Sequence, residues 1–155
     1  MKVEELMDRQ PLTARPETPV RELARRMYET RRSSVPIVDE AGHVVGIVTM
    51  TDLVARNANL HFPRYIQLLD SIIYLESTKE YEEELRRILA STAGELMTAP
   101  ARTVRLGSDA GDAAAELFEQ KITALPVVDD AGRLVGLLSQ YEFLKLIAEE
   151  PAPAE

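Results

Sequence analysis

The stretch Val35-Pro36-Ile37-Val38-Asp39, continued by Val44-Val45-Gly46-Ile47-Val48-Thr49, decides the fold of this chain of 155 residues. Both apolar runs are short and rich in β-branched residues, and the Asp, Glu, Ala and Gly at positions 39–42 between them are typical of a turn. The pattern therefore predicts two short buried strands joined as a hairpin.

The same pattern returns 90 residues later, so the chain contains an internal duplication. Residues 5–53 align with residues 95–143 without a gap, and 14 of the 49 aligned positions are identical. Average composition would give about three identities. Pro36, Gly42 and Gly46 are among the residues that recur, as Pro126, Gly132 and Gly136.

An amphipathic helix is predicted ahead of each hairpin, and a second short helix after it. Residues 20–28 show helical spacing of apolar side chains, with Thr18 as the expected cap and Pro19 at the helix entry. Each repeat is thus roughly β-α-β-β-α, an α/β unit of about 50 residues. So small a unit leaves much apolar surface in contact with water. We therefore expect the two copies, at residues 1–57 and 92–148, to pack face to face.

Residues 58–91 are predicted to form a helical insertion between the repeats. Its helices are expected at residues 63–75 and 79–90. Apolar positions run nearly around the first of these helices, which fits packing within the chain or a subunit interface. The tail, residues 149–155, contains Pro151 and Pro153 and is predicted to be disordered.

Composition argues against several classes of function. The net charge is −8 and the pI is about 4.9, so nucleic acid is not an expected partner. There is no cysteine, no cluster of metal ligands and no nucleophile–base pair, so we predict neither a metal site nor a catalytic residue. No apolar run reaches 18 residues and no signal peptide is evident, and hence we expect a cytoplasmic location without membrane contact.

The end of each hairpin carries a hydroxyl residue followed three positions later by an acid. These pairs are Thr49 with Asp52 and Ser139 with Glu142. In one interpretation each pair is a capping box that starts the next helix. In the other, the hydroxyl and the first helical N–H groups face a phosphate, while the acid accepts hydrogen bonds from a ribose diol.

The two hairpins with their flanking residues resemble a tandem pair of CBS domains, which is also called a Bateman module. The resemblance rests on positions 35–39, 42, 46–49 and 52–53 together with their counterparts 90 residues on, and on Leu6-Met7 and Leu96-Met97 ahead of Thr13 and Thr103. It implies two repeats related by pseudo-two-fold symmetry, with two clefts that hold adenosine-bearing ligands such as AMP, ADP, ATP or S-adenosylmethionine.

Carried over by position, the resemblance assigns Thr49 and Asp52 to phosphate and ribose in one cleft, and Ser139 and Glu142 in the other. It places the base against short segments of the two repeats. These are Thr13-Ala14 and Ser34-Val35-Pro36 in the first, and Thr103-Val104 and Ala124-Leu125-Pro126 in the second.

Two departures from the family pattern predict unequal clefts. Glu142 replaces the commoner Asp, and the family's frequent basic residue before the Pro is absent from both repeats. Residues 15–34 contain six Arg against three Glu, whereas residues 105–124 contain two basic against four acidic residues. We hypothesise one phosphate-binding site, where Asp52 lies near the Arg-rich helix, and one weak or vacant site with Glu142.

The sequence therefore predicts a non-catalytic regulatory module that needs no cofactor and binds an adenine nucleotide or S-adenosylmethionine as its regulatory ligand. We also expect a homodimer. The alternative is an interaction or oligomerisation module with vestigial clefts.

Overall fold

The computed structural model describes residues 1–61 and 89–154. The insertion helix predicted at residues 63–75 lies outside these ranges, and so does the one predicted at residues 79–90 apart from residues 89 and 90. Tail residues 151–154 are exposed and in neither helix nor strand, and their predicted disorder stays a prediction.

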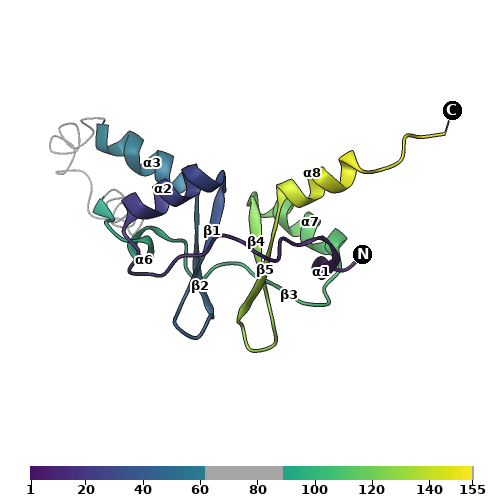
Figure 1. The fold of residues 1–155 in the computed structure, drawn as a ribbon, viewed down its shortest axis with the longest axis horizontal. Coiled ribbons are helices and arrows are strands. Elements are labelled where there is room, and N and C mark those ends of the chain that lie inside the picture. Colours follow the sequence, from purple (N-terminus) through teal and green to yellow (C-terminus); the bar gives the residue numbers. More distant parts are fainter. Residues whose placement is uncertain (62–88, 155) are drawn as a thin grey trace, which may run out of the picture.

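Each repeat is a β-hairpin flanked by helices, and the predicted mixed α/β architecture is confirmed (Figure 1). The first repeat comprises α1 (Val3–Leu6), α2 (Val20–Thr30), β1 (Ser34–Val38), β2 (Val44–Thr49) and α3 (Met50–His61). The second comprises α6 (Ala93–Leu96), β3 (Val104–Arg105), α7 (Ala110–Glu119), β4 (Ala124–Val128), β5 (Leu134–Ser139) and α8 (Gln140–Ala148).

The antiparallel hairpin has the same register in both repeats. The antiparallel pair β1–β2 sets Ser34 opposite Thr49, and β4–β5 sets Ala124 opposite Ser139. In the second repeat β3 adds a parallel strand beside β4. In the first repeat this strand is reduced to one parallel bridge at Ala14.

An aspartate organises each hairpin turn. Asp39 Oδ1 accepts hydrogen bonds from the N–H groups of Ala41 and His43, at 3.0 and 2.9 Å. Asp129 does the same in the second repeat, with Ala131 and Arg133. The backbone bonds from His43 and Arg133 are the main reason why the pKa of each aspartate lies below its usual range.

The prediction that Thr18 caps α2 is wrong. Pro19 occupies the N-cap position, and no side chain caps this helix. The Thr18 hydroxyl instead accepts a hydrogen bond from the Arg15 N–H at 3.0 Å, and its carbonyl accepts one from Ala93 N–H at 2.8 Å. Thr18 thus joins the start of α2 to the second repeat.

The N-terminal segment of each repeat crosses over to the other repeat. Asp8 exchanges two backbone hydrogen bonds of 2.9 Å with Leu137 on β5, and Thr98 exchanges two of 2.9 and 3.1 Å with Ile47 on β2. Figure 1 shows the consequence, since α1 lies beside α7 and α6 lies beside α2. Each contact recurs with its residue numbers shifted by 90, as a two-fold axis between the repeats requires.

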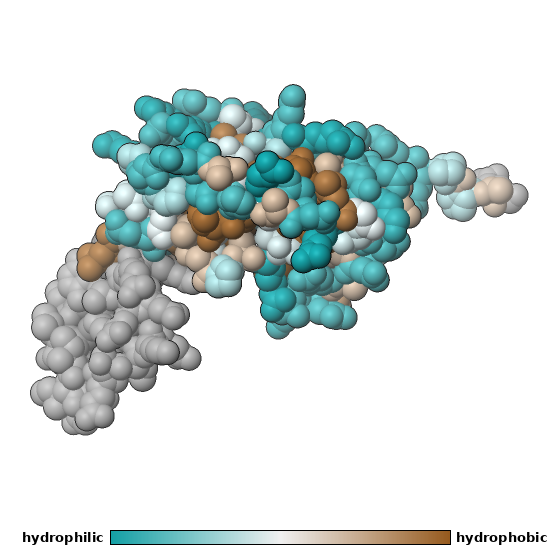
Figure 2. Space-filling view, turned by 90° about the horizontal axis from the view of Figure 1, so that it is seen from below, coloured by the Kyte–Doolittle hydropathy of each residue, from teal (hydrophilic) through white to brown (hydrophobic). Residues whose placement is uncertain are grey.

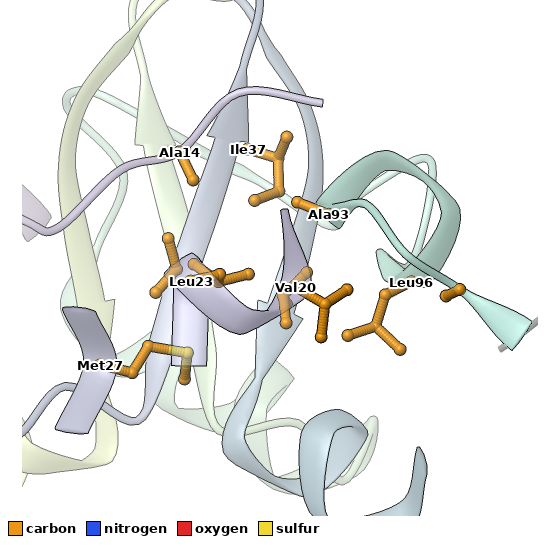
Figure 3. Packing of buried hydrophobic residues seen from close by; sticks show 10 residues of the cluster. Ala14, Val20, Leu23, Met27, Ile37, Ala93 and Leu96 are labelled. Atoms are coloured by element: carbon orange, nitrogen blue, oxygen red, sulfur yellow. The ribbon is translucent and has the colours of Figure 1, made fainter. Parts of the chain in front are cut away.

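The crossing segments complete the hydrophobic cores. Val3 and Met7 pack in the core of the second repeat, with residues such as Leu125 and Leu138. Ala93 and Leu96 pack in the core of the first repeat; Figure 3 shows Leu96 beside Val20, and Ala93 near Ile37. Since neither core is complete without the other repeat's segment, the two repeats form one packing unit. The sequence boundaries 1–57 and 92–148 stay a prediction.

The side of the molecule that carries the hairpin turns is mainly hydrophilic. Figure 2 views this side and shows hydrophobic residues gathered near the middle of the face.

Among the described residues, no helix has the length and apolar character that spanning a bilayer demands.

We predict that Gly46→Ala and Gly136→Ala each destabilise the fold by about 1–3 kcal/mol, because overpacking forces the backbone to shift. A Cβ at Gly46 would lie 3.0 Å from the Thr98 carbonyl oxygen, and one at Gly136 would lie 2.9 Å from that of Asp8, with the Met97 and Met7 side chains closer still. Urea denaturation measures the effect.

The control is Gly111→Ala in α7, where the nearest atom is a side-chain oxygen of Asp109, and alanine is the better helix former. Equal stability changes for all three variants would contradict the role of the crossing segments.

Candidate functional site

The predicted hydroxyl–acid pairs lie at two strand-to-helix junctions. β2 ends at Thr49 and α3 begins at Met50, while β5 ends at Ser139 and α8 begins at Gln140. Each hydroxyl therefore lies at the N-terminus of a helix, where backbone N–H groups and the helix dipole favour an anion.

Both pairs form capping interactions, as the structural interpretation predicts. The Thr49 N–H donates to Asp52 Oδ2 at 2.8 Å, and the Asp52 N–H lies 3.4 Å from Thr49 Oγ1. The Ser139 N–H donates to Glu142 Oε2 at 2.7 Å, and the Ser139 hydroxyl accepts from Tyr141 N–H at 3.2 Å. Capping occupies one carboxylate oxygen of each acid, so the other oxygen can accept a further donor.

The Asp52 pair faces a cavity of about 360 Å³, here named the Asp52 cleft. Residues of both repeats line it: Ile47, Thr49, Thr51, Asp52, Thr98, Pro100, Arg102, Lys121, Ile122, Thr123 and Ala124. The acid comes from the first repeat, whereas most of the opposite wall comes from the second.

The Glu142 pair faces the related cavity of about 380 Å³, here named the Glu142 cleft. It is lined by Asp8, Thr30, Arg31, Arg32, Ser33, Ser34, Leu137, Ser139, Tyr141 and Glu142. Here the acid comes from the second repeat and the opposite wall from the first. A further cavity of about 520 Å³ touches Thr49 and Thr123 of one cleft and Ser33 and Ser139 of the other, so the two clefts adjoin.

The structure places the charged residues in other clefts than the sequence hypothesis does. Arg31 and Arg32, which follow the Arg-rich helix, line the Glu142 cleft and not the Asp52 cleft. The cations of the Asp52 cleft are Arg102 and Lys121. The hypothesis that pairs Asp52 with the Arg-rich helix is therefore wrong, because each cleft combines the acid of one repeat with the opposite wall of the other.

Several residues assigned to the base by resemblance are core residues, and their contact with a ligand stays a prediction. Val35, Pro36, Leu125 and Pro126 are completely buried core residues. Ala14 and Val104 are also buried, in parallel pairing with Ile37 and Val127, and the Ala14 N–H donates to the Pro36 carbonyl at 3.2 Å. Thr13 and Thr103 are more exposed but line neither cleft. Ser34 and Ala124 do line them.

Sequence reasoning missed several residues that line the clefts. The crossing segments bring Thr98 and Arg102 to the Asp52 cleft and Asp8 to the Glu142 cleft, while Lys121 comes from the end of α7 and Tyr141 from α8. One signal was available, because an isolated glycine within a strand, such as Gly46 or Gly136, marks the close approach of another backbone.

Known families and proteins match this chain along most of its length. The CBS domain matches at residues 3–59 and again at residues 93–149. CBSX1, a chloroplastic CBS domain-containing protein of Arabidopsis thaliana, is 31% identical over 138 residues, which cover 81% of this chain and 54% of that protein. The chain thus spans about half the length of this relative.

Several of the matched proteins are enzymes. Inosine-5′-monophosphate dehydrogenase of Mycobacterium tuberculosis is 29% identical over 87% of this chain, but the match covers only 20% of the enzyme.

Solved structures with this fold include two that hold adenosine compounds. CBSX2 in complex with AMP has a TM-score of 0.81 and 23% identity, and the match covers 97% of this chain and 99% of that one. The CBS domain pair of protein MJ0100, in complex with 5′-methylthioadenosine and S-adenosyl-L-methionine, has a TM-score of 0.69 and 22% identity, with 96% of both chains covered.

We predict that Ser139→Ala lowers the free energy of unfolding by about 1 kcal/mol, because its hydroxyl caps α8. Urea denaturation followed by circular dichroism measures this loss. Ser33→Ala removes an exposed hydroxyl of the same cleft, and we expect it to leave stability unchanged. If both variants were equally stable, the capping role would be refuted.

Proposed function

The chain belongs to the CBS-domain family, with two copies of the domain, and on that premise we propose that it is a non-catalytic regulatory module that binds an adenosine-containing ligand. One observation carries the proposal. Each strand-to-helix junction presents a hydroxyl and a partly free carboxylate to a cleft whose opposite wall belongs to the other repeat.

In the Asp52 cleft, the proposed ligand is recognised at three places. The carboxylate oxygen of Asp52 that does not cap α3 accepts hydrogen bonds from the ribose diol. The phosphate lies near the Thr49 hydroxyl and the N-terminus of α3. Lys121, on the opposite wall, offers a positive charge to the phosphate.

The base is expected between the apolar residues of the same cleft. Ile47, Pro100 and Ile122 line it, and they come from both repeats. Flat aromatic bases bury well between such side chains, and a small number of polar groups sets their orientation. The cleft volume of about 360 Å³ suits a small ligand of nucleoside size.

The Glu142 cleft offers the same arrangement with altered chemistry. Glu142 and Ser139 replace Asp52 and Thr49, and Tyr141 adds an aromatic ring that is 70% exposed. The longer glutamate side chain caps α8 and keeps one carboxylate oxygen for a ribose. We propose this cleft as the second nucleoside site.

Related structures support the ligand class. Two proteins with the same fold hold AMP, or 5′-methylthioadenosine and S-adenosyl-L-methionine, according to the complexes described above. A ligand in either cleft of this chain would touch both repeats. Its binding therefore favours one arrangement of the repeats over others, which is how a bound nucleoside could change the affinity for a partner.

We predict that AMP binds the wild-type chain and that Asp52→Ala weakens this binding about tenfold or more, since the carboxylate accepts charge-assisted hydrogen bonds. Isothermal titration calorimetry measures the affinity. Asp130→Ala, which removes an exposed aspartate from the hairpin turn, is the matched control. Binding that neither variant alters would remove Asp52 from the site, and lack of binding by any adenosine compound would favour the interaction module.

We further propose that the chain forms a homodimer through its helices. Exposed apolar side chains recur at equivalent positions of the two repeats, with Tyr28 85% and Phe118 84% exposed, and Val54 and Leu144 each 62% exposed. An isologous contact between two copies buries such matched surfaces on both.

Tyr28→Glu combined with Phe118→Glu is expected to shift a dimer towards monomer, because the interface would then bury unpaired charges. Sedimentation velocity measures the shift. Ala41→Glu, at an exposed position of the hairpin turn, serves as the control and should leave the dimer intact. A wild-type chain that stays monomeric at all concentrations would rule out the homodimer.

A further inference from the structure

We propose that Asp8 and Thr98, which occupy equivalent positions in the two clefts, determine which kind of adenosine compound each cleft binds. The Asp52 cleft, with Thr98, selects a nucleoside phosphate. The Glu142 cleft, with Asp8, selects an adenosine derivative whose 5′ substituent has no negative charge. This inference rests on the proposed function and assigns a ligand class to each cleft.

The structure holds the Asp8 carboxylate in the cleft. The Asp8 backbone exchanges two hydrogen bonds with Leu137, two residues before Ser139 on β5. Its side chain is only 19% exposed, forms an ion pair with Arg32, and accepts a hydrogen bond from Gln10 N–H at 2.9 Å. These contacts hold the carboxylate in place among the residues that line the cleft.

The equivalent position of the Asp52 cleft has no negative charge. Thr98 makes the same backbone contacts with Ile47, but its side chain is neutral. A phosphate in the Asp52 cleft would therefore meet a threonine where a phosphate in the Glu142 cleft would meet a carboxylate. Two negative charges that share one partly desolvated cleft repel each other strongly.

The other charged residues that line the two clefts also give them different net charges. In the Glu142 cleft, Arg31 and Arg32 are balanced by Asp8 and Glu142. In the Asp52 cleft, two cations face one carboxylate, which leaves one positive charge in excess.

One cation of each cleft is already paired, but the partner of Arg102 lies outside the Asp52 cleft. Arg102 lies 3.5 Å from Glu116, a residue outside the cleft, and its side chain is 55% exposed. Lys121 forms no ion pair with the described part of the chain. In the Glu142 cleft, Arg31 likewise forms no ion pair within residues 1–61 and 89–154, whereas Arg32 is paired with Asp8, which itself lines the cleft.

A buried hydroxyl indicates what the Glu142 cleft accepts. Ser34 is 3% exposed and lines this cleft, and its Oγ has no hydrogen-bond partner among residues 1–61 and 89–154. A buried polar atom without a partner is costly, and a ligand that supplies a hydrogen bond removes this cost. The equivalent residue of the Asp52 cleft is Ala124, so only the Glu142 cleft offers this neutral polar group.

Calorimetry with two probes, AMP and 5′-methylthioadenosine, tests the assignment. We expect one AMP per wild-type chain, and one 5′-methylthioadenosine per chain when the protein is already saturated with AMP. Two AMP molecules bound with equal affinity would overturn the inference, and so would the inability of 5′-methylthioadenosine to bind the AMP-saturated protein. If neither compound bound, the proposed function itself would fail.

Exchanging the two residues tests their role directly. Asp8→Thr is expected to create a second AMP site, and Thr98→Asp to weaken the first about tenfold or more. Asp112→Thr, on the exposed surface of α7, controls for the change in net charge. Asp8→Asn, which keeps the shape of the side chain, provides the same test should Asp8→Thr fail to fold. Unchanged AMP stoichiometry in the folded Asp8 variant would overturn the inference.

Discussion

The reciprocal crossing of the two N-terminal segments is the contact on which this structure depends. Backbone hydrogen bonds join Asp8 to Leu137 and Thr98 to Ile47, so the segment of each repeat pairs with the sheet of the other. The segment backbones lie so close to the strands that a Cβ at Gly136 or Gly46, at the crossing points, would collide with them. The pairing also inserts Val3 and Leu96, both almost completely buried, into the cores of the opposite repeats. The hydrophobic core of each repeat is therefore completed by the other repeat.

The crossing also explains why the clefts are composite. Because each N-terminal segment lies across the other repeat's hairpin, Thr98 comes to the cleft of Asp52, and Asp8 to the cleft of Glu142. A ligand bound there must contact both repeats, which makes its binding sensitive to their relative arrangement. The symmetry of the backbone does not extend to the side chains, since equivalent positions carry Thr or Asp, and Ala or Ser.

Periodicity and turn residues were sufficient to predict the two hairpins, the helix ahead of each and the junctions at Thr49 and Ser139. These features depend on contacts within a repeat, and the duplication doubled the signal. The partners of each junction could not be predicted, because nothing local to Asp52 shows that Lys121 of the other repeat faces it. For the same reason, the Arg-rich helix was assigned to the wrong cleft. The resemblance places Val35 and Leu125 at the ligand; both side chains are buried in the core, so their contact with a ligand through backbone groups stays a prediction.

A crystal structure of the chain grown with AMP would show whether a bound ligand contacts both repeats. We expect one AMP whose ribose lies at Asp52 while its other contacts include Thr98 or Lys121 of the second repeat. An AMP held entirely by residues of one repeat would show that the binding cleft is not shared between the repeats.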